Sequence, residues 1–474
     1  MTLVVAFIGI TRPPVWTDEA ATISAADRGV SAFVDLVSTI DIVHGLYYLL
    51  MMPWIDVFGS SPLSIRTPSA LVLTAGAFIA VRLTMRYAHV EAPDRAVTAG
   101  LAAGVLFAVL PGLAWMGQEA RPYPFGTVCA LLAWWSYERW LRTHEDRWLI
   151  LLVVAHLLAI YFTLYAAMAV PLYVLRALGH GRRTALKATG AAAALGAGTL
   201  PLVLTAVPQQ GQVSWISTTP LSMLQGMAAK QFFIGYGLSD GPWFEPVRVI
   251  AVILACLTLV LVLLGMVLGP LRRTQAWLWS WIAFPALVLL VVRLVGGQFY
   301  EARFLAFTAP ALVVLLALVT TVCIRRRAVG LVTLGVVVVL CVPAVIGQHE
   351  RTKNNSDYRS AYALLERADT IYFLDAGSRA IVTAYPQQTP AKDPMLLESP
   401  EESGSLYGRN RLLDVALQGS PSGTTAVVTQ RADREGQGDN HDAVVDRFVS
   451  TGCTVQASLE DAYNRSTLLE CPAP

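Results

Sequence analysis

The sequence predicts a mainly α-helical, polytopic membrane protein that ends in a small soluble α/β domain. Of its 474 residues, 55% are hydrophobic and only 14% are charged, whereas soluble proteins carry about 25% charged residues. The apolar residues gather in long runs that stop near residue 347, and basic residues fall in alternate loops between those runs. A net charge of +2 gives no reason to expect a nucleic-acid partner.

About eleven segments are apolar enough to be transmembrane helices, because a span needs about 20 mostly apolar residues. They lie near residues 1–11, 67–85, 96–115, 124–141, 148–164, 165–178, 188–207, 247–268, 275–294, 304–323 and 328–347. The first run is short, which suggests a natural start upstream. No site typical of signal-peptide cleavage follows it, so we do not expect a cleaved leader.

Basic residues set the expected orientation, because cytoplasmic loops are enriched in Arg and Lys. The basic loops hold Arg86 and Arg95; Arg142 and Arg147; Arg182, Arg183 and Lys187; Arg272 and Arg273; and Arg325, Arg326 and Arg327. The opposite loops are 12–65, 116–123, 208–246, 295–303 and everything after 348. We therefore expect a multi-pass protein of the plasma membrane with an extracytoplasmic C-terminal domain.

Two domains are expected, a transmembrane domain over 1–347 and an extracytoplasmic α/β domain over 348–474. The first outer loop, 12–65, holds the candidate catalytic acids. Its amphipathic stretches at 29–40 and 42–58 are typical of helices that lie along a membrane interface.

The C-terminal domain is expected to alternate short helices and strands, which predicts an α/β fold. Helices are expected at 358–367, 376–385 and 441–450, strands at 370–374, 425–429, 453–457 and 466–471, and a loop-rich stretch at 386–424. A disulfide between Cys453 and Cys471 fits an oxidising compartment. Two unpaired thiols are the alternative.

Ionisable residues near an apolar layer are candidates for function, and four clusters of them fall in the outer loops. Asp18 and Glu19 are adjacent acids that could provide a general base and a metal or substrate contact. The simpler interpretation is a helix start, where acids are favoured. Asp41 and His44, followed by Tyr47, could share one helix face, although an isolated His is more often structural.

The third and fourth clusters combine acids, arginines and aromatic residues. Gln118, Glu119, Arg121 and Tyr123 lie in a very short outer turn, a combination that suits recognition of a polar headgroup. The alternative is a local pair between Glu119 and Arg121.

Glu301 and Arg303 begin a late span, and Arg66 begins an early one. Either arginine could bind a lipid phosphate. The alternative is the generic contact that interfacial arginines make with lipid headgroups.

Four motifs from residues 18 to 123, taken in chain order, resemble those of the GT-C superfamily of membrane glycosyltransferases. The resemblance covers about residues 15–310 and is closest to the branch of the protein O-mannosyltransferases and the lipid A aminoarabinose transferase, especially actinobacterial mannosyltransferase-type members. The matching strings are Asp18-Glu19, the acid–His–Tyr-Tyr segment from Asp41 to Tyr48, Arg66-Thr67-Pro68-Ser69, and Gln118-Glu119-Ala120-Arg121-Pro122-Tyr123.

Two positions depart from the family pattern. Many relatives have His-Pro-Pro-Leu-Tyr-Tyr where this chain has His44-Gly45-Leu46-Tyr47-Tyr48, and many have a His where Leu164 stands here. Any role of that second His is therefore absent from this chain, and metal binding is put in doubt.

The resemblance implies an inverting glycosyltransferase whose donor is a sugar linked through phosphate to a polyprenol in the membrane. The acceptor is extracytoplasmic: a protein, a lipoglycan or a wall glycan. Mannose is the sugar that the likeness favours, with arabinose as an alternative. The implied reaction is a hexosyl or pentosyl transfer.

The resemblance also implies roles for the clustered residues. Asp18 is the expected base, and Glu19 is expected to orient the acceptor or a metal. Arg121 and Arg303 are expected to bind the donor phosphate, with Arg66 as a third candidate. The expected substrate pocket consists of Asp41, His44, Tyr47, Gln118, Glu119, Tyr123 and Glu301. Asp18, Glu19 and His44 could bind Mg²⁺ or Mn²⁺.

Two other classes remain as alternatives. A transporter or flippase of lipid-linked glycans predicts charged residues near the bilayer midplane and often paired repeats. A non-catalytic envelope assembly or sensor protein predicts that Asp18 tolerates replacement.

Overall fold

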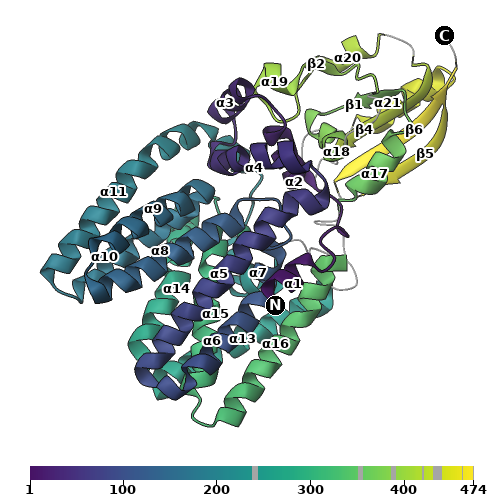
Figure 1. The fold of residues 1–474 in the computed structure, drawn as a ribbon. Coiled ribbons are helices and arrows are strands. Elements are labelled where there is room, and N and C mark those ends of the chain that lie inside the picture. The colour runs from purple at the N-terminus through teal and green to yellow at the C-terminus, as the bar shows by residue number, and fades with distance from the viewer. Residues whose placement is uncertain are drawn as a thin grey trace. The chain divides into compact units, whose positions relative to one another are not determined.

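A computed structural model describes residues 1–236, 244–350, 356–385, 391–418, 421–430, 440–461 and 463–472 (Figure 1). The chain forms two compact units. Unit 1 consists of Met1–Ile10, Ile42–Tyr47 and Arg66–Glu350, and unit 2 of Thr11–Asp41, Tyr48–Ile65 and Arg351–Pro474. This division differs from the expected boundary at residue 347, because most of the first outer loop belongs to the same unit as the C-terminal domain.

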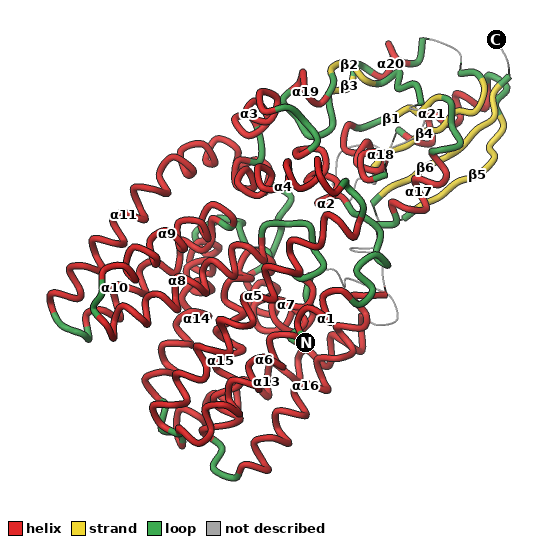
Figure 2. The backbone as a smooth tube through the Cα atoms, viewed as in Figure 1, coloured by secondary structure: helices red, strands yellow, loops and turns green. Residues whose placement is uncertain are grey.

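Unit 1 is built from helices, as the red tube in Figure 2 shows. Each of the eleven apolar runs contains helix. The helices are α1 (Thr2–Phe7), α5 (Pro62–Glu91), α6 (Ala96–Val109), α7 (Pro111–Met116), α8 (Tyr123–Thr143), α9 (Asp146–Phe162), α10 (Val170–Leu178), α11 (Arg182–Ala206), α12 (Pro220–Gln225), α13 (Phe244–Leu268), α14 (Arg272–Leu294), α15 (Ala309–Leu318) and α16 (Arg327–Glu350).

Six helical segments in the described residues are long and apolar enough to cross a membrane: Pro62–Glu91, Arg182–Val213, Phe244–Val267, Arg272–Leu294, Ala302–Cys323 and Arg327–His349. The multi-pass helical fold is thus confirmed. The other expected spans are shorter or less apolar. The run 96–115, for example, divides into α6 and α7 at Pro111, because proline has no N–H to continue the helical bonding.

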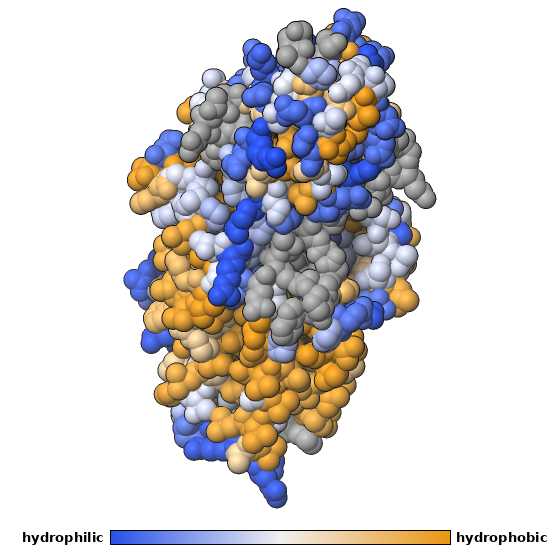
Figure 3. All heavy atoms as spheres, turned by 90° about the vertical axis from the view of Figure 1, so that its right-hand side faces the viewer, coloured by the Kyte–Doolittle hydropathy of each residue, from blue (hydrophilic) through white to orange (hydrophobic). Residues whose placement is uncertain are grey.

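The segment Ala302–Cys323, which contains α15, is almost completely buried within unit 1. It packs against α6 and α14 on its sides. Beside it, the rings of Trp134 and Trp281 stack with their centroids 5.1 Å apart. Apolar side chains are exposed along α13 and α16, and Figure 3 shows an orange band of hydrophobic residues over the helical part.

A buried acid joins three helices of unit 1. The carboxylate of Glu138 on α8 lies 2.7 Å from Arg176 of α10 and 3.5 Å from Arg86 of α5. Glu138 also accepts a hydrogen bond of 2.7 Å from Tyr87, whose hydroxyl accepts one from Trp134. Because two cations compensate this single acid, its burial carries no unpaired negative charge.

Unit 2 has a four-stranded sheet in the order β1-β4-β6-β5. β1 (Thr370–Phe373) is parallel to β4 (Gly423–Gln430), whereas β6 (Asn464–Cys471) is antiparallel to both β4 and β5 (Thr454–Glu460). The helices are α17 (Tyr358–Leu365), α18 (Ala380–Ala384) and α21 (His441–Ser450). The helices and strands therefore lie where the sequence predicts them.

Two further parts complete unit 2. The stretch expected to be loop-rich also contains β2 (Leu396–Glu398), α19 (Pro400–Ser403), β3 (Arg409–Asn410) and α20 (Leu413–Ala416). The first outer loop contains α2 (Thr17–Ala26), α3 (Val30–Thr39) and α4 (Gly45–Phe58), so both of its amphipathic stretches are helical.

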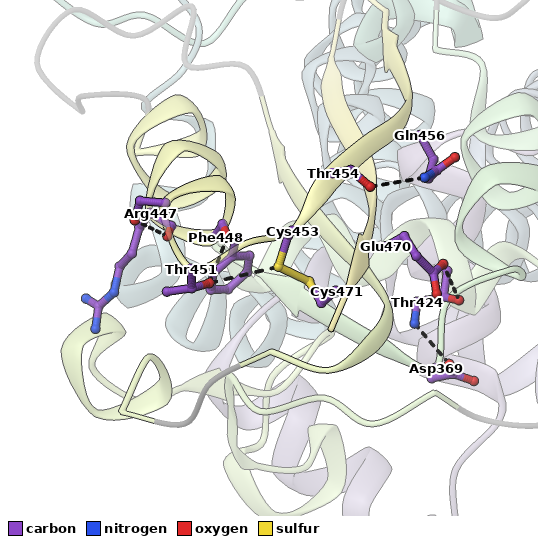
Figure 4. The surroundings of a disulfide bond; sticks show 11 residues. Asp369, Thr424, Arg447, Phe448, Thr451, Cys453, Thr454, Gln456, Glu470 and Cys471 are labelled. Carbon is purple, nitrogen blue, oxygen red and sulfur yellow. Dashed lines mark hydrogen bonds between the residues drawn. A yellow bond between two sulfur atoms is a disulfide. The ribbon is translucent and has the colours of Figure 1, made fainter. Parts of the chain in front are cut away.

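A disulfide joins Cys453 to Cys471 (Figure 4), the pair that the sequence singles out. It links the residue before β5 to the last residue of β6. The four cysteines in the apolar helices, Cys129, Cys256, Cys323 and Cys341, are free. The bridge closes a separation of 18 residues at the end of the strand pair.

Replacing both Cys453 and Cys471 by Ala should destabilise unit 2. A bridge over a loop of this length stabilises by about 3 kcal/mol, which for a domain of this size corresponds to on the order of 10 °C in unfolding temperature. Proteolysis of the purified protein along a temperature ramp, followed by loss of the C-terminal fragment, measures the change. Cys256→Ala, at an exposed free thiol, is the control. Equal melting of the double variant and the control would contradict the prediction.

Candidate functional site

Asp18 and Glu19 lie in the first turn of α2 in unit 2. Asp18 is half-buried and Glu19 is completely buried. Acids at this position are favoured by the helix dipole, so the structural interpretation of this pair holds. A chemical role remains compatible with this interpretation, because the side chain of Asp18 is partly exposed.

Three tyrosines of the C-terminal domain hold the start of α2. The hydroxyl of Tyr385 accepts a 2.9 Å hydrogen bond from the Val15 N–H, and the hydroxyl of Tyr358 lies 2.7 Å from that of Thr17. Tyr407 donates a 3.2 Å bond to the Thr17 carbonyl. Burial raises the pKa of Tyr358 well above its ordinary value, so its hydroxyl keeps its proton. The backbone just before Asp18 is therefore held in place within unit 2.

The other end of α2 is tied to the C-terminal domain by Arg28. Its guanidinium donates to the carbonyl of Ser24 at 2.8 Å, to the hydroxyl of Ser24 at 2.9 Å and to the carbonyl of Ser405 at 3.2 Å. The Ser24 hydroxyl in turn donates to the carbonyl of Leu406. Both ends of the acidic helix thus bind residues more than 300 positions away.

Asp41 has a backbone φ of 66°, a left-handed conformation that Asp tolerates better than most residues. It precedes the short helix Ile42–His44 instead of joining it. The expectation that Asp41 and His44 share one helix face is therefore wrong. Asp41 instead accepts a hydrogen bond from the hydroxyl of Tyr48.

In unit 1, Arg121 contacts His44. Its Nη2 lies 3.2 Å and 3.4 Å from the two ring nitrogens of His44, across 77 positions of sequence. Arg121 is only 5% exposed. Tyr47, which follows His44 closely, is completely buried and packs against Phe125 with ring centroids 5.6 Å apart. The second and third clusters thus meet in unit 1.

Gln118 and Arg66 bind the backbone of the first apolar run. Gln118 donates to the carbonyls of Ala6 at 3.0 Å and Ile8 at 2.7 Å, and Arg66 donates to that of Ile10 at 2.6 Å. Arg66 has no exposed surface. Both residues position the first run, and phosphate binding by Arg66 stays a hypothesis.

Glu119 is also completely buried, and its backbone carbonyl accepts a 2.5 Å bond from Ser69. This bond joins the outer turn to α5. The segment 118–121 is therefore held from two sides, by the first apolar run and by α5, which keeps Arg121 in a defined place.

Arg303 is 8% exposed and lies among aromatic rings. Its guanidinium carbon is 4.2 Å from the ring centroid of Tyr236, 5.8 Å from that of Trp215 and 5.9 Å from that of Tyr123. Such contacts stabilise a cation where water is scarce. Because Tyr123 follows Arg121 by two residues, the third and fourth clusters also meet.

Glu301 has a local role. Its carboxylate accepts a 2.9 Å hydrogen bond from the N–H of Ala302 and lies 3.3 Å from the ammonium of Lys230. It caps the 3₁₀ turn Ala302–Thr308 that carries Arg303, and we interpret it as a residue that positions this turn.

Comparison with known proteins rests on structure alone. No family model matches the sequence, and no curated protein matches it. ArnT from Cupriavidus metallidurans in the apo state aligns with a TM-score of 0.56 and 12% identity, over 98% of this chain and 96% of that chain. The same protein bound to undecaprenyl phosphate aligns with a TM-score of 0.59, 12% identity and the same coverage. The fold is similar to that of ArnT.

The similarity to ArnT supports the mainly helical membrane fold with a small C-terminal sheet. At 12% identity it concerns the fold alone. The archaeal oligosaccharyltransferase AglB from Archaeoglobus fulgidus, in complex with an inhibitory peptide and a dolichol-phosphate, matches with a TM-score of 0.44 and 11% identity, over 90% of this chain and 69% of that chain. That match is too loose to support a comparison.

The described residues do not form a metal site of the usual kind. Among them, no group of three or more His, Cys, Asp or Glu side chains is arranged to bind an ion. Binding of Mg²⁺ or Mn²⁺ by Asp18, Glu19 and His44 therefore stays a hypothesis, which transfer measured before and after chelation would test.

Several contacts of the site could not be found from the sequence. Nothing local marks Tyr358, Tyr385 or Tyr407 as partners of the segment before Asp18, because they lie 341 to 390 positions away. Trp215 and Tyr236 belong to the outer loop 208–246, whose length was the only signal of a role.

Replacing Tyr385 by Phe should loosen the start of α2, because the Val15 N–H loses its acceptor. A hydrogen bond contributes about 1 kcal/mol net, so exchange of the peptide that contains Val15 should accelerate roughly fivefold. Hydrogen–deuterium exchange with mass spectrometry measures this. Tyr463→Phe, at an exposed turn residue, is the control, and equal exchange in the two variants would refute the assignment.

Proposed function

We propose that this chain is an inverting glycosyltransferase that moves a sugar from a polyprenyl-phosphate donor to an extracytoplasmic acceptor. The observation that carries the proposal is a fold similar to that of ArnT over 98% of the chain. ArnT has been solved bound to undecaprenyl phosphate, and we extend that ligand class to this chain. Arg121 and Arg303, two nearly buried cations of unit 1, support the extension.

In the proposed reaction, a hydroxyl of the acceptor attacks the anomeric carbon of the donor sugar. A bond forms between that carbon and the acceptor oxygen, the bond to the phosphate oxygen breaks, and the configuration inverts. The acceptor proton moves to a base, and the polyprenyl phosphate leaves with the bonding electrons. The protein must therefore supply one base and stabilise the negative charge that grows on the phosphate.

Arg121 and Arg303 are the proposed ligands of that phosphate. A guanidinium in a site with little water stabilises a leaving oxyanion far better than it would in bulk water. His44 beside Arg121 and the rings around Arg303 hold the two side chains in place, so little reorganisation is needed. Tyr123 lies beside Arg303, and Tyr47 is a proposed wall of the pocket.

Asp18 is the proposed base. Of the two acids, Asp18 is the one that keeps some exposed surface. Contacts at both ends of α2 hold the helix, and with it Asp18, in place within unit 2. Glu19, which is buried, is proposed to orient Asp18 or the acceptor. Asp41 belongs to the same unit and has its own partner in Tyr48.

The sugar, the acceptor and the orientation are proposed from the family likeness. Mannose is the proposed sugar, and a protein, a lipoglycan or a wall glycan the proposed acceptor. The basic loops of unit 1 are proposed to lie in the cytoplasm and unit 2 outside it. A panel of radiolabelled polyprenyl-phosphate sugars, offered with membrane extract, identifies the donor.

Asp18→Asn should lower the rate of sugar transfer roughly 10²- to 10⁴-fold, because it removes a general base and keeps the shape of the side chain. Transfer of radiolabelled sugar by the purified protein measures this. Asp35→Asn, at an exposed acid of α3, is the matched control and should keep full activity.

Full transfer by the Asp18 variant would leave the proposed glycosyltransferase activity standing but would show that Asp18 is not its base. If the folded wild type transfers sugar from none of the donors, the transporter or the non-catalytic interpretation would replace the proposal.

Arg303→Gln should raise the donor concentration needed for half-maximal rate roughly 10- to 100-fold, because a charge-assisted hydrogen bond contributes about 1.5–3 kcal/mol. Arg303→Lys should have an intermediate effect, since lysine keeps the charge but loses the planar contact with the rings. Donor titrations of both variants measure this.

The control for these titrations is Arg248→Gln, which removes an exposed arginine paired with Glu245 on α13. Donor affinities that are equal in the Arg303 and Arg248 variants would exclude Arg303 from phosphate binding.

A further inference from the structure

Unit 1 has a cleft of about 490 Å³ whose lining includes Arg325 and Arg326. It lies where the last turns of α13, the π-helical turn Val319–Cys323 and the start of α16 meet. Leu261, Leu264, Val319 and Val329 supply apolar walls, and Arg325 and Arg326 belong to the same lining. The cleft is thus apolar with two cations on its edge.

The backbone around the cleft is irregular for a membrane helix. The turn Val319–Cys323 is wider than an α-helix, and such turns are frequent at functional sites. α16 packs so closely against this turn that a Cβ at Gly330 would lie 2.0 Å from the carbonyl oxygen of Thr320. The turn and α16 are therefore closely packed where they form one wall of the cleft.

Two nearby arginines have structural partners. Arg327 pairs with Asp94. Arg95 donates to the carbonyls of Thr321 and Ile324, both at 3.0 Å, and to that of Arg325 at 2.9 Å. These bonds tie the loop between α5 and α6 to the turn that leads into α16.

Arg325 and Arg326 differ from these two. Both are exposed, and in the part of the chain that the structure describes neither side chain pairs with an acid. Asp94, the acid at this junction, is already paired with Arg327. Among the described residues, no acid therefore pairs with the two positive charges in the lining of the cleft.

We propose that this cleft binds an anionic phospholipid. Its acyl chain lies along Leu261, Leu264 and Val329, and its phosphate contacts Arg325 and Arg326. Charge complementarity selects an anionic headgroup, because basic pockets between membrane helices bind such headgroups and the guanidinium fork matches phosphate oxygens. The apolar walls select a lipid over free phosphate. The site is separate from the proposed transfer reaction.

Native mass spectrometry of the purified full chain tests this with phosphatidylglycerol and phosphatidylcholine of identical acyl chains. The wild type should retain phosphatidylglycerol in preference to phosphatidylcholine. The double variant Arg325→Gln, Arg326→Gln should lose retention of phosphatidylglycerol roughly thirtyfold, because each basic residue near an anionic headgroup contributes about a fivefold factor.

Two matched controls separate the site from its surroundings. Arg182→Gln with Arg183→Gln removes the same charge from exposed residues at the start of α11 and should leave retention unchanged. Val329→Trp fills the cleft and should release the lipid, whereas Val332→Trp, at an exposed position outside the lining, should not. Circular dichroism confirms that each variant is folded.

Three outcomes would overturn the proposal. Equal loss of phosphatidylglycerol in the Arg325/Arg326 and the Arg182/Arg183 double variants would mean that overall charge, and not this cleft, retains the lipid. Equal retention of the two lipids would mean simple filling of an apolar gap. Displacement of phosphatidylglycerol by millimolar inorganic phosphate would mean a site for a free anion.

Discussion

Helical hydrogen bonding is the constraint on which the rest of this structure depends. In a layer without water, every backbone N–H and C=O must be paired within the protein, and helices achieve this with their own residues. Unit 1 therefore consists of helices around the buried segment Ala302–Cys323. The candidate phosphate ligands lie in short turns at the ends of helices, in 118–121 and in the turn that carries Arg303.

The two compact units divide the candidate chemistry between them. Unit 1 supplies cations, Arg121 beside His44 and Arg303 among aromatic rings. Unit 2 supplies the acids of α2. The C-terminal domain holds this helix through tyrosine hydroxyls and through the Ser405 carbonyl, which binds Arg28. The C-terminal domain therefore has a role apart from any binding of the acceptor, because it positions the helix that carries the proposed base.

The arginines of unit 1 differ in how far their side chains are exposed and in what surrounds them. Arg66 has no exposed surface and binds a backbone carbonyl of the first apolar run. Arg303 is nearly buried among rings, where a cation gains most from a phosphate partner. Arg325 and Arg326 are exposed beside an apolar cleft, where an anionic lipid would satisfy both features. The same residue type thus has three different environments in unit 1.

Hydropathy and local pattern were enough to predict the helical membrane fold, the main helices and strands of the C-terminal domain and the pairing of Cys453 with Cys471. They did not predict β2, β3, α19 and α20, which lie in a stretch expected to be loop-rich. The folded chain was needed to show that α2 belongs with the C-terminal domain, that Arg66 and Gln118 bind the first apolar run, and that Trp215 and Tyr236 surround Arg303. Those outcomes depend on hydrogen bonds and ring contacts between residues that are mostly 50 to 390 positions apart, and no local pattern records which distant partner a side chain meets.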